Sequence, residues 1–150
     1  MVEVIEKIQK HARKLKDNRE PVSPGMEAAF TEACQPGDGI WQGDLGLEIV
    51  EEVPADYEPA KTLTEKDKQL VLGSTQGARH CLETLDGVKL FYPKGWSEES
   101  LQGPCFVLAK SNRVLHPVHG AVSIPAGFTV LCRYQREWNK EQAKERRARD

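Results

Sequence analysis

The chain has 150 residues, of which 39% are hydrophobic and 29% charged, a mixture that predicts one folded domain and excludes a disordered chain. Its 21 basic and 23 acidic residues give a formal charge of -2, which excludes a strong overall attraction to nucleic acid or anionic membranes. The apolar runs are shorter than the ~20 residues of a membrane-spanning helix, and the first residues lack the apolar centre of a secretion signal. We therefore expect a cytoplasmic protein.

Two helices are expected at the start of the chain, within residues 1–36. The first has an amphipathic pattern, with apolar residues at steps of three and four: Val2, Ile5, Ile8, Ala12 and Leu15. Its narrow apolar face favours packing on the rest of the domain, a protein partner or a second copy of the chain. A second, shorter helix is expected to start at Ser23-Pro24, to carry Met26, Ala29, Phe30 and Ala33 on one side, and to end at Pro36-Gly37.

The remaining residues, 37–150, have the pattern of a β domain. Leu45, Leu47 and Ile49 alternate along a first strand, and a charged loop with two prolines follows over residues 54–68. Segments of strand length then recur at 69–72, 79–85, 88–92, 105–109, 114–115, 121–124 and 128–134. Asp86-Gly87 is typical of a two-residue hairpin turn. Since no helical pattern separates these segments, an antiparallel sandwich or small barrel is predicted.

The last strand and the tail complete the expected domain. Along residues 128–134 one face carries Phe128, Val130, Cys132 and Tyr134, which we expect to be either the buried or the exposed set. Residues 137–150 place Glu141 and Lys144 at helical spacing, which predicts a short, solvated helical tail. The four cysteines lie far apart without a CxxC pair and are expected to be reduced thiols.

A group of histidines is the first candidate site. His116 and His119 lie three residues apart in a Pro-Gly turn, and His80 starts a strand after a glycine-bounded turn. Imidazole is the commonest protein ligand of divalent transition metals, so these three residues are the candidate metal ligands, assisted by Cys81 or Glu83. The competing interpretation is a purely structural turn, because this spacing lacks the helical register of metalloprotease motifs.

The basic end of the chain is the second candidate site. Arg133, Arg136 and Trp138 combine guanidinium groups with an aromatic ring, which is a pattern suited to RNA or single-stranded DNA. Interspersed acidic residues dilute this charge, so the same segment can be an ordinary solvated surface.

Five motifs in this order resemble a family of small, largely uncharacterised proteins of bacteria and bacteriophages: Trp41-Gln42-Gly43-Asp44, Leu72-Gly73 to His80, His116-Pro117-Val118-His119-Gly120, Ile124-Pro125-Ala126-Gly127-Phe128 and Tyr134-Gln135-Arg136-Glu137-Trp138. The resemblance covers roughly residues 41–150. The HxH segment of that family is similar to the first metal motif of cupins, which implies a jelly-roll or cupin-like barrel with a histidine-bound metal. In this chain Ala78 replaces the first of those histidines, and the segment after Pro125-Ala126-Gly127 brings no ligand.

Three hypotheses of function remain open. The first is a non-catalytic binding or accessory protein of phage origin, with the helix at residues 2–15 as its partner surface. The second is a cupin-like enzyme that uses a divalent transition metal on His80, His116 and His119, and it predicts that the three imidazoles converge. The third is a nucleic-acid accessory module that acts through the basic tail.

Overall fold

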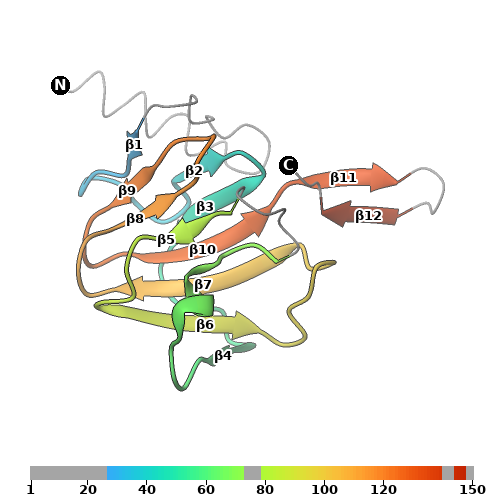
Figure 1. Ribbon diagram of the computed structural model, residues 1–150, viewed down its shortest axis with the longest axis horizontal. Coiled ribbons are helices and arrows are strands. Elements are labelled where there is room, and N and C mark those ends of the chain that lie inside the picture. The colour runs from blue at the N-terminus through green and yellow to red at the C-terminus, as the bar shows by residue number, and fades with distance from the viewer. Residues whose placement is uncertain (1–26, 73–78, 140–143, 148–150) are drawn as a thin grey trace.

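The computed structural model describes residues 27–72, 79–139 and 144–147, and the regular secondary structure of this part of the chain is almost entirely β-strand (Figure 1). The strands are β1 (Ala28–Ala29), β2 (Gly39–Gln42), β3 (Leu45–Val50), β4 (Tyr57–Pro59), β5 (Cys81–Leu82), β6 (Val88–Pro93), β7 (Gln102–Leu108), β8 (Asn112–Leu115), β9 (Val122–Ile124), β10 (Thr129–Tyr134), β11 (Arg136–Asn139) and β12 (Lys144–Arg147). Among the described residues, one 3-10 helix is present, at Glu65–Lys68. Within the described ranges, no helix has the length and apolar character needed to cross a membrane.

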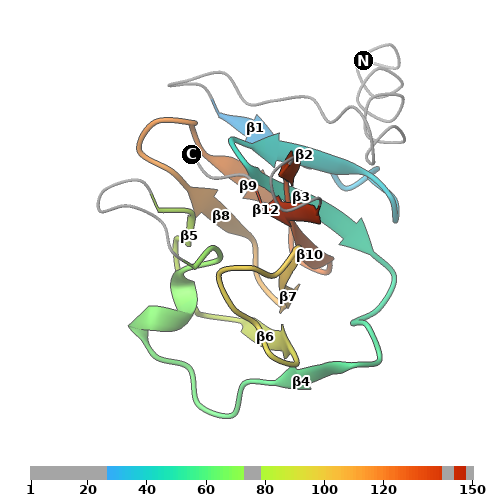
Figure 2. The same cartoon turned by 90° about the vertical axis from the view of Figure 1, so that its right-hand side faces the viewer.

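Two sheets pack face to face, and Figure 2 shows them as two layers. One has the strand order β1-β9-β8-β5 and the other the order β2-β3-β10-β7-β6-β4, while β11 and β12 form a separate hairpin. All pairs are antiparallel except β1 with β9. The main core joins side chains of both sheets, among them Leu47, Phe106 and Val130 from one and Val114 and Val122 from the other. The predicted β-rich class therefore agrees with the structure, whose described strands form two main sheets.

Strand β10 shows how alternation sets the core. Val130, Cys132 and Tyr134 face the space between the sheets and are almost completely buried. Leu131, on the opposite face, is buried too, in a small second cluster with Cys105 and Tyr57. Both faces of β10 are thus covered, as expected for a central strand between β3 and β7.

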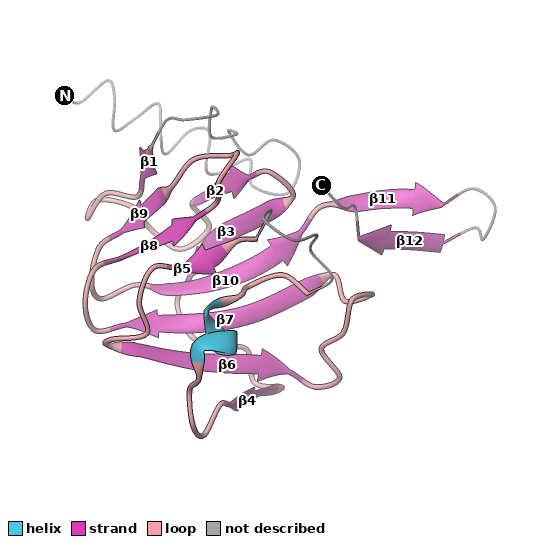
Figure 3. Ribbon diagram, viewed as in Figure 1, coloured by secondary structure: helices cyan, strands magenta, loops and turns pink. Residues whose placement is uncertain are grey.

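The prediction of N-terminal helices and a helical tail is wrong for the part of the chain that the structure describes (Figure 3). Where the second helix was expected, β1 pairs with β9: the amides of Ala28 and Phe30 donate to carbonyls of Ala121 and Ser123, each at 2.9 Å. These long-range bonds satisfy the backbone better than a short isolated helix, whose own propensity is weak. The first predicted helix, residues 2–15, and its role in self-association lie outside the described residues.

The tail forms the β11–β12 hairpin instead of a helix. Its register places Arg136 opposite Arg147, Glu137 opposite Arg146, Trp138 opposite Glu145 and Asn139 opposite Lys144. Helical charge pairs contribute only about 0.2–0.5 kcal/mol each, so they do not decide between the two structures. In the hairpin the register brings one pair of opposite charges, Glu137 and Arg146, to facing positions.

The turn at Asp86-Gly87 does not close a hairpin. Strand β5 before it pairs with β8, whereas β6 after it pairs with β4 and β7, so this turn carries the chain from one sheet to the other. Gly87 has a φ of +74°, which explains why glycine suits this crossing. The predicted strand at residues 69–72 contributes a single bridge, Gln69 to Cys81.

Candidate functional site

The fold brings the three predicted histidines together between the two sheets. His80 lies just before β5, and His116 and His119 belong to the turn that joins β8 to β9. The ring centroid of His116 is 4.3 Å from that of His80 and 4.5 Å from that of His119. His80 and His119 are 6.3 Å apart with nearly parallel rings. The convergence that the sequence predicts for these imidazoles is therefore present.

Both ring nitrogens of His80 bond to side chains around the β2–β3 turn. Nδ1 lies 2.8 Å from Oε1 of Gln42, and Nε2 lies 3.1 Å from Oδ1 of Asp44. The amide of Gln42 cannot be reversed, because its nitrogen donates to the carbonyls of Val114 at 2.9 Å and Gly120 at 2.6 Å. Nδ1 of His80 therefore donates to Gln42, and Nε2 faces the carboxyl group of Asp44. His80 and Asp44 are almost completely buried, so this pair lies inside the protein.

His116 organises the turn that contains it. Its Nδ1 accepts hydrogen bonds from the backbone amides of Val118 and His119, both at 3.1 Å. An acceptor that binds the amides two and three residues further on is the geometry of an Asx turn, here made by an imidazole. Nδ1 of this residue is consequently an unprotonated acceptor committed to the backbone.

This bonding bears on the metal prediction. A metal ion requires a lone pair from each ligand, and the nitrogens of His80 face acceptors while Nδ1 of His116 faces two amides. Among the residues that the structure describes, no group of three or more His, Cys, Asp or Glu side chains is arranged to hold a metal ion. Metal binding by His80, His116 and His119 stays a prediction, one that the hydrogen bonds do not favour.

The residues predicted for nucleic-acid binding belong to two parts of the fold, the sandwich and the terminal hairpin. Arg133 is half-buried in β10 and forms an ion pair with Glu48 of the adjacent strand β3. Arg136 and Trp138 belong to β11, in the hairpin beyond the sandwich (Figure 1). Arg133 is thus engaged within the sheet, and the role of the other two stays a prediction.

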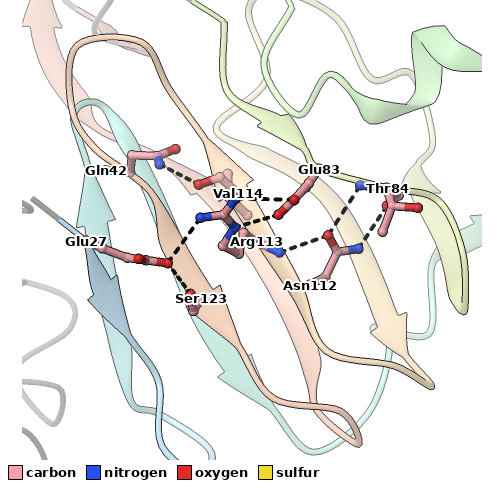
Figure 4. A network of polar contacts seen from close by, with 8 residues as sticks. All are labelled: Glu27, Gln42, Glu83, Thr84, Asn112, Arg113, Val114 and Ser123. Carbon is pink, nitrogen blue, oxygen red and sulfur yellow. Dashed lines mark hydrogen bonds and ion pairs between the residues drawn. The ribbon is translucent and has the colours of Figure 1, made fainter. Parts of the chain in front are cut away.

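The sequence interpretation missed a row of polar side chains across the outer face of the four-stranded sheet (Figure 4). Arg113 of β8 forms a bidentate pair with Glu83, at 2.5 and 3.2 Å, and its third contact is Glu27 at 3.5 Å. Glu27 also accepts a hydrogen bond of 2.6 Å from Ser123 of β9. Glu83, offered above as an assistant to a metal, is instead the partner of this arginine. We call Glu27, Ser123, Arg113 and Glu83 the polar row.

The charges of the polar row reinforce one another. The hydrogen bond from Arg113 lowers the pKa of the Glu83 carboxyl, and the bond from Ser123, followed by that from Arg113, lowers the pKa of Glu27. The same carboxylates raise the pKa of Arg113. All three groups are therefore charged at neutral pH, and the row carries one more negative than positive charge.

A groove of about 670 Å³ opens beside the polar row. Its described walls combine apolar and polar residues: Phe30, Glu83, Thr84, Ser111, Asn112, Arg113, Ser123, Ile124 and Pro125. Asn112 supports its floor, because its side-chain amide donates to the carbonyl of Thr84 at 2.8 Å. The sequence offers one clue to this site, which is the polar residue Arg113 between the buried Asn112 and Val114. Its partners Glu83 and Glu27 lie 30 and 86 positions earlier in the chain, and only strand pairing brings them to Arg113.

Comparison with known proteins places the body of the chain in a family. No curated protein and no solved structure matches the chain. One family profile, described as "Domain of unknown function (DUF8820)", matches residues 41–134, a range that includes the histidine cluster and most of the sandwich. The match confirms an uncharacterised family, whereas a bacterial or phage origin and the likeness to cupins stay predictions. Because the match spans more than half of its length, the chain belongs to the family of the domain of unknown function DUF8820.

Proposed function

We propose that this chain is a small, non-catalytic binding domain. One observation carries the proposal: three ring nitrogens of the histidine cluster are bonded within the protein. Both nitrogens of His80 and Nδ1 of His116 contact other groups of the protein, within a nearly closed space between the sheets. A general base or a metal ligand needs a lone pair directed at its target, which these three nitrogens do not offer.

The same hydrogen bonds give the histidine cluster a structural role. Through Gln42 and Asp44 it ties the β2–β3 turn of one sheet to His80, and through Gln42 it ties that turn to β8 and to Gly120 of the other sheet. Such a buried network, when its members are satisfied, fixes loop positions at the end of a sandwich. This role supports a binding domain with a rigid frame.

Two substitutions of His116 test the proposal. Asparagine places a carbonyl oxygen where Nδ1 stands and keeps the acceptor for the two turn amides, whereas alanine removes it. We expect His116→Ala to lower the free energy of unfolding by about 1–3 kcal/mol, and His116→Asn to lower it by less than half of that loss. Urea unfolding with and without a chelator measures both, together with elemental analysis of the purified wild type.

The metal hypothesis predicts a different pattern. It requires a stoichiometric transition metal in the wild type, a loss of stability on adding chelator, and loss of the metal in both variants, since asparagine is a poor substitute for an imidazole ligand. That pattern would contradict the proposal and favour a metal-dependent function.

A second candidate function, contact with single-stranded nucleic acid, is supported by the β11–β12 hairpin. The hairpin extends away from the sandwich (Figure 1), and its eight residues include four basic and two acidic ones. Its register sets Arg136 directly opposite Arg147. Protruding two-stranded ribbons are a known shape of nucleic-acid readers.

A further inference from the structure

We infer that the groove beside the polar row receives an arginine or lysine side chain of a protein partner. The inference rests on the proposed binding function and names the chemistry of the ligand and the place where it binds. It is carried by the charge balance of the polar row and by the mixed lining of the groove.

The guanidinium of Arg113 is not available for an anion. Its Nε and Nη2 donate to the two oxygens of Glu83, and its Nη1 contacts Glu27. A bidentate carboxylate occupies the face that would otherwise bind a ligand carboxylate or phosphate. An anionic ligand would have to displace Glu83 and would then meet two uncompensated carboxylates.

The surplus of charge at this place is negative. Glu27 and Glu83 contribute two negative charges against the single positive charge of Arg113, and all three side chains are between two-fifths and about half exposed. Glu27 is not part of the groove's described wall, but its contact with Arg113 brings its negative charge to the edge of the groove. A cation therefore gains from entering the groove.

The apolar lining favours a cation with an aliphatic stem over a bare ion. Phe30, Ile124 and Pro125 line the same groove as Glu83 and Arg113. Lysine and arginine pack their methylene groups along apolar surface while the charged end stays among polar groups. The volume of about 670 Å³ lies within the range of ligand pockets and leaves room for residues that flank the side chain.

An NMR titration with small probes tests the inference. Isotope-labelled protein is titrated with the N-acetyl methylamides of arginine and lysine, and with those of norleucine and glutamate as neutral and anionic controls. We expect the cationic probes to shift the amide signals of Glu83, Thr84, Arg113 and Ser123, and the two control probes to leave them unchanged.

Two variants give opposite predictions for a cation site and an anion site, and a third serves as their control. Glu83→Gln should weaken binding of the cationic probes about two- to five-fold, and Arg113→Gln should strengthen it by a similar factor, because each changes the net charge by one unit in a partly exposed place. Glu58→Gln, at an exposed position of β4 in the other sheet, is the matched control and should change nothing. Thermal unfolding of each variant verifies that it is folded.

Two results would overturn the inference. One is binding of the glutamate probe that Arg113→Gln abolishes, which would show an anion site. The other is the absence of shifts at the polar row with either cationic probe. Neither result depends on the metal content or on the His116 variants, so a failure here is distinguishable from a failure of the proposed function.

Discussion

Tyr134 makes two hydrogen bonds and one close ring contact, and these limit which residues can stand beside it. Its hydroxyl donates to the carbonyl of Leu70 at 2.7 Å and accepts a bond of 3.1 Å from the indole nitrogen of Trp96. The ring lies against Gly103 of β7, where an added Cβ would be 2.2 Å from the hydroxyl oxygen and 2.6 Å from Cζ. Gly103 is therefore required for space, whereas its backbone is not in the left-handed region.

Replacing Gly103 should reveal this steric requirement. We expect Gly103→Ala to lower the free energy of unfolding by about 1–3 kcal/mol, because the fixed ring of Tyr134 cannot move without losing two hydrogen bonds. Gly127→Ala is the matched control: no atom lies within 4 Å of its Cβ, and its φ of +94° should cost only about 1 kcal/mol. Urea unfolding measures both.

The partner of the clash can be tested by a double-mutant cycle. Tyr134→Phe removes the hydroxyl that stands nearest to the new methyl group, so its effect and that of Gly103→Ala should be less than additive. Strictly additive losses would show that Gly103 is required for another reason.

At the scale of single elements, local pattern predicted the central strands well and the edges badly. Strands β3, β6 and β10 have alternating or continuous apolar residues, and the sequence predicts each within one or two residues of its observed bounds. The two-residue strand β1 and the three-residue β4, which contains Pro59, have no such pattern. They exist because β9 and β6 offer them hydrogen bonds, which is information that a local window does not contain.

In the candidate sites, too, local features could be predicted from the sequence and long-range contacts could not. The convergence of the three histidines could be predicted because two of them share one turn and the third begins a strand. The roles of Gln42 and Asp44 could not, since they depend on contacts across 36 and 38 positions. The polar row depends on the register of β8 with β9, which the local sequence around Arg113 does not contain.

The β11–β12 hairpin makes a prediction of its own as an element. If it contacts nucleic acid, a labelled single-stranded oligouridine should bind at low salt, and the logarithm of the affinity should fall linearly with the logarithm of salt concentration, by about 0.7 per phosphate contacted. The double variant Arg136→Gln with Arg147→Gln should flatten that slope, whereas Lys89→Gln, an exposed change in β6, should not. Fluorescence anisotropy measures the binding, and no binding at low salt would remove this function.

For the whole molecule, the buried thiols and phenols set the limit of stability at high pH. All four cysteines are free thiols, and Cys34, Cys105 and Cys132 are buried. Burial raises the pKa of Cys105 to about 12 and that of Cys132 well above its ordinary value. Burial likewise raises the pKa of Tyr57 and, together with Asp67, that of Tyr92. Cys105, Cys132, Tyr57 and Tyr92 therefore stay neutral in the folded state at a pH where the same groups of the unfolded chain have begun to ionise.

The free energy of unfolding should therefore fall as the pH rises above the unfolded thiol pKa of about 9. Since the folded-state pKa values are raised, the stabilisation is complete below that pH and is lost between about 9 and 12, by up to about 1.4 kcal/mol per pH unit for each group that ionises only when unfolded. Urea unfolding across this range measures the slope, and Cys105→Val should reduce it by removing one such group. A stability that is flat over the range would contradict the burial of these groups.

The fixed orientation of the Gln42 amide determines the direction of the hydrogen bonds that link the two sheets. Hydrogen bonds run in one sense only, from the imidazole of His80 into the amide oxygen and from the amide nitrogen out to the carbonyls of Val114 and Gly120. A change in the electron density of the His80 ring therefore polarises the amide of Gln42 and, through it, the backbone of β8. This strand carries Arg113 on its other side. An isotope label in the Val114 carbonyl would make β8 a vibrational reporter of events at a histidine that solvent scarcely reaches.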